Sequence, residues 1–566
     1  MTPRAATSLV LIIAIVALLA VAVRPRRAST LDFYLAGQRI GVVTNACAIC
    51  GDYFSAASFL GVAAAVYASG LDGMWYATGF AAGFVPVVLF IAAPLRRFGE
   101  FSIPDFLGRR LESSAVRLTA VGVVQLVILS YLVPQAVGSG ITWELLVGHG
   151  AAGMDAYTTG VVVSTTVITT LVVLGGMRGT TWTQAVQFLF LLAVLLWLTV
   201  ATVGSGFSYP SAADGIRQEP FHNPVLHEDG WRLVPQDNAL DPTRAARFDE
   251  PGARYDRLSQ FALVITLVLG TAGLPHVMNR YFTSPSGWAA RLTTVWVLGL
   301  AGLFYALAVA LGTAARALLA DAADDHDWLG ELTVEGVLHV PEHALLALGR
   351  LYGGFAGLGL IATGALVAVM STIAGLLLAA AASWGHDVYE RHLRPRATQE
   401  QAVRAGRLAV VAVATLSATL ALALRPESLT ALFPSVVAQM VTWAFAVAGS
   451  GLTPVFVLAI WWPRTTASGA VTGMAVGSSV AVATVAAGLW TGGGVLLLAP
   501  ALLAAPAATI ACLAVSAVTS PPPGVEAAWV RLHGTAADRQ AERLARLTIR
   551  GVDGERSRRS PARRRR

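Results

Sequence analysis

The sequence contains no lysine and has few charged residues of any kind. All forty basic residues are arginine, and charged residues make up only 13% of the 566 residues, whereas hydrophobic residues make up 55%. A soluble domain carries roughly 25% charged residues. The composition therefore excludes an ordinary soluble domain and predicts a protein that lies in lipid.

Cysteine is scarce as well. Only Cys47, Cys50 and Cys512 are present, each inside an apolar segment, which excludes a disulfide framework and a complete zinc site. Cys47 and Cys50 form a CxxC pair, but no second pair or neighbouring histidine accompanies them. The sequence also lacks a recognisable pairing of nucleophile and base, so we predict neither redox chemistry nor an enzyme.

Long apolar runs are what the chain has in abundance. Many are long enough to cross a hydrocarbon core of about 30 Å, which takes roughly 17 to 25 helical residues. We therefore predict an all-α polytopic membrane protein with about thirteen transmembrane helices. The predicted spans are 8–24, 41–69, 74–95, 116–145, 157–175, 182–204, 259–279, 289–318, 350–383, 404–424, 430–461, 467–490 and 493–517.

Arginine positions predict the orientation, because cytoplasmic loops retain positive charge. Arginines cluster after the first, third and ninth spans, on loops that alternate to one side, and again in the tail at 556–566. The N-terminus is then outside and the C-terminus inside. An alternative is that residues 1–22 are a cleaved signal peptide ending at Ala20–Ala22, but the arginine cluster that follows disfavours export.

Two predicted external loops, 205–258 and 321–345, are long and polar, and the first shows no helical periodicity. The second loop is rich in acidic residues, but it lacks the spacing and the glycine of an EF-hand. A solvated acidic face is favoured over a calcium site. The acidic residues of this loop include Asp321, Asp324, Asp325, Asp327 and Glu331.

Polar residues interrupt the second predicted span at 50–61. Gly51, Ser55 and Ser58 weaken helix propagation there, and Asp52 is costly to bury without a partner. If the helix breaks here, freed carbonyls of Gly51 and Phe54 can bind a hard cation, and the next half-helix presents its positive end. The alternative is a small-residue packing face between helices.

The ninth span carries a second polar group. Ala368, Ser371 and Thr372 are spaced i, i+3 and i+4, so a carbonyl and two hydroxyls share one helix face. Such hard oxygen ligands suit a cation such as sodium. The alternative is that both hydroxyls bond back to carbonyls of the preceding turn.

These segments resemble the sodium:solute symporter family, and within it most of all the cation/acetate (monocarboxylate) symporters. The resemblance extends from residue 31 to about 474 and preserves several motifs in the family's order. The motifs are LDFYLAG at 31–37, the segment 51–61, FSIPDFL at 101–107, GGMR at 175–178, GTAGLPH at 270–276 with Arg280, the segment 368–372, WWPR at 461–464 and Gly469-Ala470.

The resemblance implies a LeuT-type fold of two inverted five-helix repeats, with broken helices opening both repeats near 51–55 and 270–275. The implied organisation has four parts. These are an accessory first helix and its basic border (1–30), a ten-helix core (31–466), two peripheral helices (467–518) and a basic cytoplasmic tail (519–566).

The resemblance also implies two sites. The sodium site would consist of the carbonyls of Gly51, Phe54 and Ala368 and the hydroxyls of Ser371 and Thr372. Candidate residues for the adjoining substrate site are Ser55, Ser58, Tyr131, Gln135, Thr271, His276 and Trp443.

Two departures from sugar and proline members are informative. Thr183-Gln184 replaces their Thr-Asp, which puts a second cation site in doubt, and Ser58 replaces a sugar-binding glutamine. Both departures agree with the monocarboxylate subgroup.

The implied function is cation-coupled symport of a small organic anion such as acetate, propionate or pyruvate, in the cell membrane of a bacterium. Sodium is the expected coupling ion, with a proton as the alternative ion, and proline, another amino acid or a sugar as the alternative substrate. Membrane lipid is the other expected partner, and neither nucleic acid nor an obligate protein partner is expected. A passive channel would need pore-lining rings, and a sensor would need a signalling domain, for which about fifty residues after 518 are too few.

Overall fold

The computed structural model describes residues 35–540, except residues 39, 100, 217–221, 228–229, 425–434, 492–493, 495–498, 536 and 539. The first predicted span (8–24) and the basic tail (556–566) lie outside the described residues. So does part of the LDFYLAG motif.

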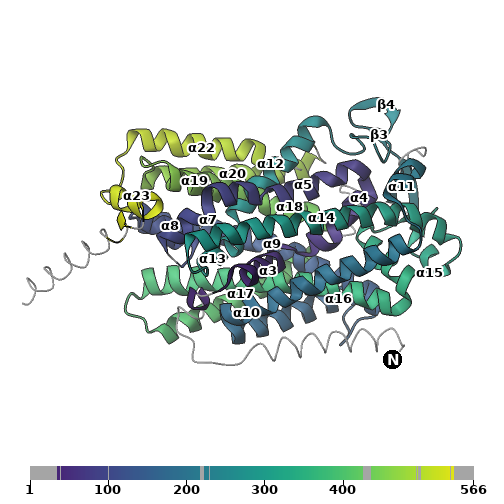
Figure 1. Ribbon diagram of the computed structural model, residues 1–566, viewed down its shortest axis with the longest axis horizontal. Coiled ribbons are helices and arrows are strands. Elements are labelled where there is room, and N and C mark those ends of the chain that lie inside the picture. The colour runs from purple at the N-terminus through teal and green to yellow at the C-terminus, as the bar shows by residue number, and fades with distance from the viewer. Residues whose placement is uncertain are drawn as a thin grey trace, which may run out of the picture.

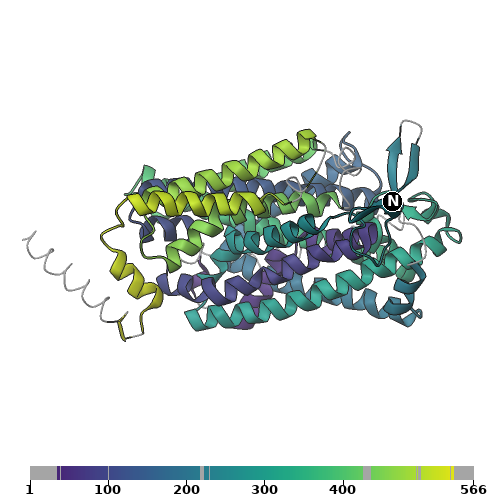
Figure 2. The same ribbon diagram turned by 90° about the horizontal axis from the view of Figure 1, so that it is seen from above.

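The described chain is mostly helical, and its long helices run side by side along the long axis of the molecule (Figures 1 and 2). Among the described residues, ten helices are long and apolar enough to cross a membrane, or eleven if one bent pair counts as a single span. The predicted all-helical membrane class is thus confirmed. The predicted count of thirteen and the orientation of the termini are not confirmed by these spans.

The first half of the described chain contains the elements up to the external strands. Their bounds are η1 (Ala36–Gln38), α3 (Val42–Tyr53), η2 (Ala57–Gly61), α4 (Val62–Ser69), η3 (Gly70–Gly73), α5 (Met74–Ala82), α6 (Phe84–Pro86), η4 (Val87–Ile91), α7 (Ala92–Phe98), α8 (Ile103–Arg110), α9 (Ser114–Val147), α10 (Ala156–Gly204), α11 (Tyr209–Ile216), β1 (His222–His227), β2 (Gly230–Pro235), β3 (Asp237–Asn238) and β4 (Asp241–Ala245).

The second half begins with the bent pair and ends in a short surface helix. Its elements are α12 (Arg257–Gly273), α13 (Pro275–Tyr281), α14 (Gly287–Ala323), α15 (Asp327–Gly330), β5 (Thr333–Val334), β6 (Val337–Leu338), η5 (Pro341–His343), α16 (Ala344–Ala382), η6 (Ser383–Leu393), α17 (Gln399–Ala423), α18 (Val436–Val447), η8 (Ala448–Leu452), α19 (Thr453–Trp461), α20 (Ala467–Thr491), α22 (Ala501–Val518) and α23 (Val525–His533).

The outer faces of the bundle carry large apolar side chains. Val200, Leu408 and Trp490 are respectively 71%, 71% and 89% exposed. A soluble protein rarely exposes apolar surface so widely, whereas lipid tails cover it at no cost. The exposed apolar faces therefore agree with a membrane-spanning bundle.

Two helices are interrupted in mid-bundle. α3 ends at Tyr53, Phe54 has non-helical backbone angles (φ −79°, ψ 86°), and the chain becomes helical again before η2. α12 ends at Gly273, Leu274 is extended, and α13 leaves at an angle of 49° to α12. Pro275 supplies no N–H to continue α12, so it begins a new helix instead. Both predicted breaks are present.

The polar loops gather at one end of the bundle. Figure 1 shows β3, β4, α11 and α15 at one end, and α8 and α23 at the opposite end. The two loops predicted to be external therefore lie on the same side. Asp321, Asp324, Asp325, Asp327 and Glu331 of the second loop are exposed, as predicted for a solvated face, whereas Glu342 of the same loop is buried.

The first of these two loops, 205–258, is more ordered than its sequence suggests. Although 205–258 shows no helical periodicity in the sequence, α11 is a helix of eight residues. Antiparallel hairpins β1–β2 and β3–β4 follow it. Elements this short leave little periodicity in the sequence, so the pattern alone could not reveal them.

A buried carboxylate anchors this loop to the bundle. Asp72 in η3 is 0% exposed. It accepts hydrogen bonds from the backbone N–H groups of Gly252 (3.1 Å), Arg254 (2.8 Å) and Tyr255 (2.8 Å), and from the Gln260 amide (3.1 Å). The carboxylate thus satisfies the backbone immediately before α12.

We predict that Asp72→Ala destabilises the protein strongly, because it leaves several buried N–H groups without an acceptor. Each such group costs about 1–3 kcal/mol, so we expect a loss of at least about 2 kcal/mol. Thermal unfolding of the purified protein in detergent measures the change. The matched control is Asp325→Ala, which removes an exposed carboxylate of the other loop; equal melting temperatures for the two variants would contradict the anchoring role.

Candidate functional site

Asp52, which is costly to bury without a partner, is paired with an arginine of the other interrupted helix. Asp52 lies in the last turn of α3 and Arg280 lies in α13, and they are respectively 0% and 1% exposed. Arg280 Nε is 3.2 Å from Asp52 Oδ2. The ion pair therefore joins α3 to α13 directly beside both helix breaks.

α10 closes a polar network around this pair. Gln184 donates to Asp52 Oδ1 (3.3 Å) and to the carbonyl of Ser371 (2.7 Å), while its side-chain oxygen accepts from Arg280. Arg280 Nη1 also donates to the Thr181 hydroxyl (2.6 Å). All the guanidinium nitrogens therefore have partners, and Gln184 connects the ion pair to α16.

Glycines allow the helices to approach this closely. A Cβ atom on Gly51 would lie 2.2 Å from the Gln184 carbonyl oxygen. A Cβ atom on Gly375 would lie 1.7 Å from Asp52 Oδ1. Backbone and carboxylate occupy the space that larger residues would need.

The residues of the predicted ion site lie on α3 and its C-terminal break and on α16, and one hydrogen bond joins the two sides. The Thr372 hydroxyl donates to the carbonyl of Asp52 (2.9 Å), which lies between Gly51 and Phe54 in the chain. The Ser371 hydroxyl donates to the carbonyl of Ala368 (2.9 Å). Ser371 thus bonds back along its own helix, but Thr372 does not and instead bridges to the interrupted helix.

Four of the predicted substrate residues lie around the break after α3. The Tyr131 hydroxyl lies next to Ser55, and the Tyr131 ring packs edge-on against His276, with 5.4 Å between ring centroids. Gln135, one turn further along α9, accepts from the N–H of Ala56 (3.1 Å). Gln135 Nε2 and both His276 ring nitrogens are buried and have no hydrogen-bond partner among the described residues.

The remaining three substrate candidates make other contacts. The hydroxyl of Ser58 is hydrogen-bonded to Tyr305 (2.8 Å), and that of Thr271 is hydrogen-bonded to Tyr53 (2.9 Å). Trp443 lies partly buried on α18. Phe445 of the same helix packs against both Tyr131 (5.7 Å) and Tyr53 (6.0 Å).

Sequence reasoning missed several residues of this network. Gln184 was noted only as a departure from other family members, and the roles of Thr181, Tyr53 and Tyr305 were not predicted. The available signal was the presence of Gln184 and Arg280 in apolar surroundings, because polar groups at bilayer depth are usually partnered or functional. Their distances along the chain from Asp52 hid the pairing.

The chemistry of the α3–α16 contact suits a small hard cation. Hydroxyl oxygens of α16 lie beside carbonyl oxygens there, and such hard oxygen atoms are the ligands that sodium prefers. The carboxylate of Asp52 is directed to Arg280 instead. The Arg280 guanidinium lies beside Gln184. Gln184 is the residue that replaces the aspartate of sugar and proline members.

We predict that Gly375→Ala disrupts the Asp52–Arg280 pair, because the added Cβ would overlap the carboxylate. Removing one partner from a buried ion pair costs about 3–5 kcal/mol, and displacing the carboxylate should cost a substantial part of that. Thermal unfolding in detergent measures the loss. Gly302→Ala is the control, since a Cβ there meets nothing within 4 Å and gains the same helix propensity; similar melting temperatures would contradict the prediction.

Comparison with known proteins agrees with this arrangement. A profile of the sodium:solute symporter family matches residues 33–477. The chain is 32% identical over 471 residues to the uncharacterised symporter YwcA of Bacillus subtilis, covering 82% of this chain and 83% of that protein. It is 31% identical over 455 residues to the monocarboxylic acid transporter of Corynebacterium glutamicum, covering 79% and 76%.

Solved structures share the fold at lower sequence identity. A sodium-coupled sialic acid symporter in a substrate-bound, outward-open state matches with a TM-score of 0.66 at 17% identity, covering 91% of this chain and 98% of that chain. A nucleobase-cation-symport-1 family transporter in a closed conformation matches with a TM-score of 0.51 at 13% identity, covering 92% and 99%. The chain therefore has the LeuT-like fold of the sialic acid symporter, and it is a multi-pass membrane transporter that belongs to the sodium:solute symporter family.

Proposed function

We propose that this chain uses a sodium gradient to carry a small monocarboxylate, such as acetate, propionate or pyruvate, into a bacterial cell. The observation that carries the proposal is the hydrogen bond from Thr372 to the carbonyl of Asp52, which joins α16 to the break in α3. Sodium would bind here to the carbonyls of Gly51, Phe54 and Ala368 and the hydroxyls of Ser371 and Thr372.

Orphaned donors beside the break support a carboxylate as the substrate. A carboxylate only accepts hydrogen bonds. Gln135 Nε2 can donate two, and His276 can donate from one ring nitrogen. Neither group has another partner among the described residues, so both are available to a small acceptor.

The tight packing around Ser58 also favours a small ligand. Its hydroxyl is occupied by Tyr305, and the rings of Phe54 and Phe304 stack beside it with centroids 4.1 Å apart. Little polar surface remains for a polyol. The relative from Corynebacterium glutamicum, a monocarboxylic acid transporter, supports the same substrate class.

The transport cycle would depend on the contact between α3 and α16. External sodium would hold these helices together and assemble the substrate site. The protein would then close over the bound sodium and substrate. Opening inward would separate Thr372 from the break, loosen the sodium ligands and release sodium and substrate. Each net positive charge that enters is driven by about 2.3 kcal/mol per 100 mV of membrane potential.

We predict that proteoliposomes containing the purified protein take up labelled acetate or pyruvate when an inward sodium gradient is imposed. Labelled proline and glucose should not accumulate, and liposomes without protein are the control. If a proton gradient stimulates uptake and a sodium gradient does not, the coupling ion is a proton and not sodium. Uptake of proline or glucose alone would overturn the substrate class, and indifference to every cation gradient would overturn symport.

We predict that Thr372→Val raises the sodium concentration needed for half-maximal uptake about tenfold, because one ligand oxygen becomes a methyl group of similar shape. Ser371→Ala should act in the same direction. The measurement is initial uptake at varied sodium concentration.

Thr415→Val is the matched control, since that exposed hydroxyl only bonds back to the Val411 carbonyl (2.9 Å). An unchanged sodium dependence in Thr372→Val, with the control normal, would reject the assignment of the ion site.

A further inference from the structure

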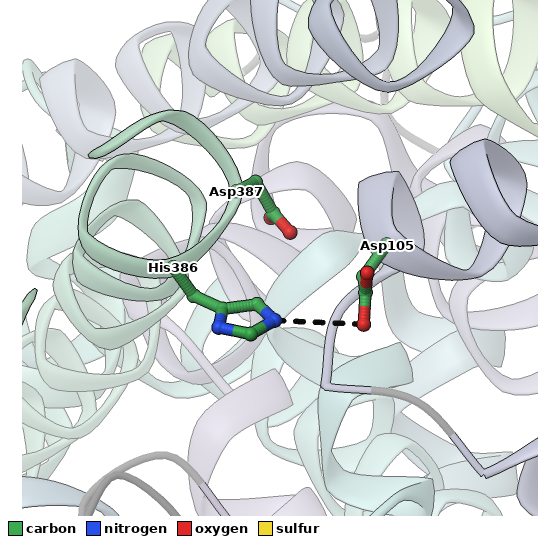
Figure 3. A group of neighbouring side chains, drawn as sticks. All are labelled: Asp105, His386 and Asp387. Carbon is green, nitrogen blue, oxygen red and sulfur yellow. Dashed lines mark ion pairs between the residues drawn. The ribbon is translucent and has the colours of Figure 1, made fainter. Parts of the chain in front are cut away.

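A second group of ionisable side chains lies away from the transport site, between α8 and the end of the α16 helix. Asp105 belongs to α8, and His386 and Asp387 are consecutive residues of η6. Figure 3 shows the three side chains converging from these two elements. One potential ligand atom from each residue lies within 4.8 Å of the other two.

Each of the three side chains is held from outside by another residue. Arg117 lies 3.2 Å from Asp105 Oδ1. The Ser102 hydroxyl donates to Asp387 Oδ2 (2.7 Å). His386 Nδ1 is 2.9 Å from Glu390 Oε2, and since an ionised carboxylate only accepts, Nδ1 carries the proton.

The outer contacts of His386 and Asp387 each use one polar atom, and Asp105 lies beside both side chains. His386 Nε2 lies 3.6 Å from Asp105 Oδ2. Neither His386 Nε2 nor Asp387 Oδ1 has a hydrogen-bond partner among the described residues, although Asp387 is 0% and His386 2% exposed. Buried polar atoms without partners are costly, so they require an explanation.

We propose that Asp105, His386 and Asp387 form a binding site for a divalent transition-metal ion of the zinc or manganese class. One imidazole and two carboxylates are common ligands of such ions. Two ligands about 2.1 Å from a tetrahedral ion lie about 3.4 Å apart, close to the observed 3.6 Å between His386 Nε2 and Asp105 Oδ2. Water would complete the coordination.

The outer contacts match the surroundings of known metal sites. A metal-bound histidine usually donates its other ring N–H to a carboxylate, which fixes the ring and raises its basicity. Glu390 provides that contact to His386. Ser102 orients the Asp387 carboxylate in the same way, and the ring of Phe101 covers His386 with 4.6 Å between ring centroids.

A doubly protonated His386 is the competing explanation. Its Nε2–H would face Asp105 across 3.6 Å, which is longer than the 2.7–3.2 Å of an ordinary N–H···O bond. It would also leave Asp387 Oδ1 without a partner. A metal ion would be bound by all three side chains at once.

Such an ion would attach the end of α16 to α8. The same helix carries Ser371 and Thr372 further toward its N-terminus, so the bound ion would restrain the helix that the proposed cycle must move. The metal site itself does not depend on the proposed function, because its residues lie outside the transport site and binding is measured without transport.

The test is equilibrium binding of Zn²⁺ and of Mn²⁺ to tag-free purified protein that has first been stripped with a chelator. We expect one equivalent of Zn²⁺ or Mn²⁺ to bind. Asp387→Asn, which keeps the side-chain shape, should weaken binding at least about tenfold, as should the outer variant Glu390→Gln. The matched control, Glu400→Gln, removes an exposed carboxylate paired with Arg404 and should bind normally.

The absence of bound metal in the wild-type protein would overturn the proposal in favour of a protonated His386. Binding that is equally tight in both Asp387→Asn and Glu390→Gln would place the metal elsewhere and overturn it as well. If Asp387→Asn fails to fold, Glu390→Gln decides the question, because the Glu390 side chain is 29% exposed and should tolerate substitution. Uptake measurements can fail independently of these results.

Discussion

The ion pair between Asp52 and Arg280 joins the two interrupted helices of the bundle. A bilayer offers no water to an unpaired charge or to the backbone groups freed at a helix break. Asp52 lies just before the break at Phe54, and Arg280 lies in the half-helix after the break at Leu274. Removing one partner of such a buried pair costs about 3–5 kcal/mol, so both breaks depend on the same contact.

α16 is the helix on which the other polar contacts converge. Its Ser371 carbonyl accepts from Gln184, its Thr372 hydroxyl bridges to α3, and its Gly375 leaves room for the Asp52 carboxylate. The adjoining η6 carries His386 to Asp105 of α8. A displacement of α16 therefore changes the ion contact and the proposed metal site together, which gives that site a physical route to influence transport.

The sequence predicted the helical membrane class and where two helices break, because apolar length, small residues and Pro275 act locally. It also indicated that Asp52 needs a partner. It could not identify that partner, since Gln184 and Arg280 lie 132 and 228 positions away along the chain. The hairpins of residues 205–258 and α11 were missed because such short elements carry no long periodic pattern, and the cluster at Asp105 was missed because its members are far apart along the chain.

The proposed anionic substrate does not require a cation of its own. Arg280 is already paired with Asp52, so its charge is neutralised before any substrate arrives. Gln135 can supply a hydrogen-bond donor to the substrate carboxylate instead. Its side-chain oxygen accepts from the freed N–H of Ala56, while its Nε2 has no partner among the described residues. A carboxylate that accepts from Nε2 would polarise the same amide and strengthen its bond to Ala56. In the proposed function, substrate would thus stabilise the break in α3 on one side while sodium stabilises it on the other, and this shared dependence on one backbone conformation would couple the two.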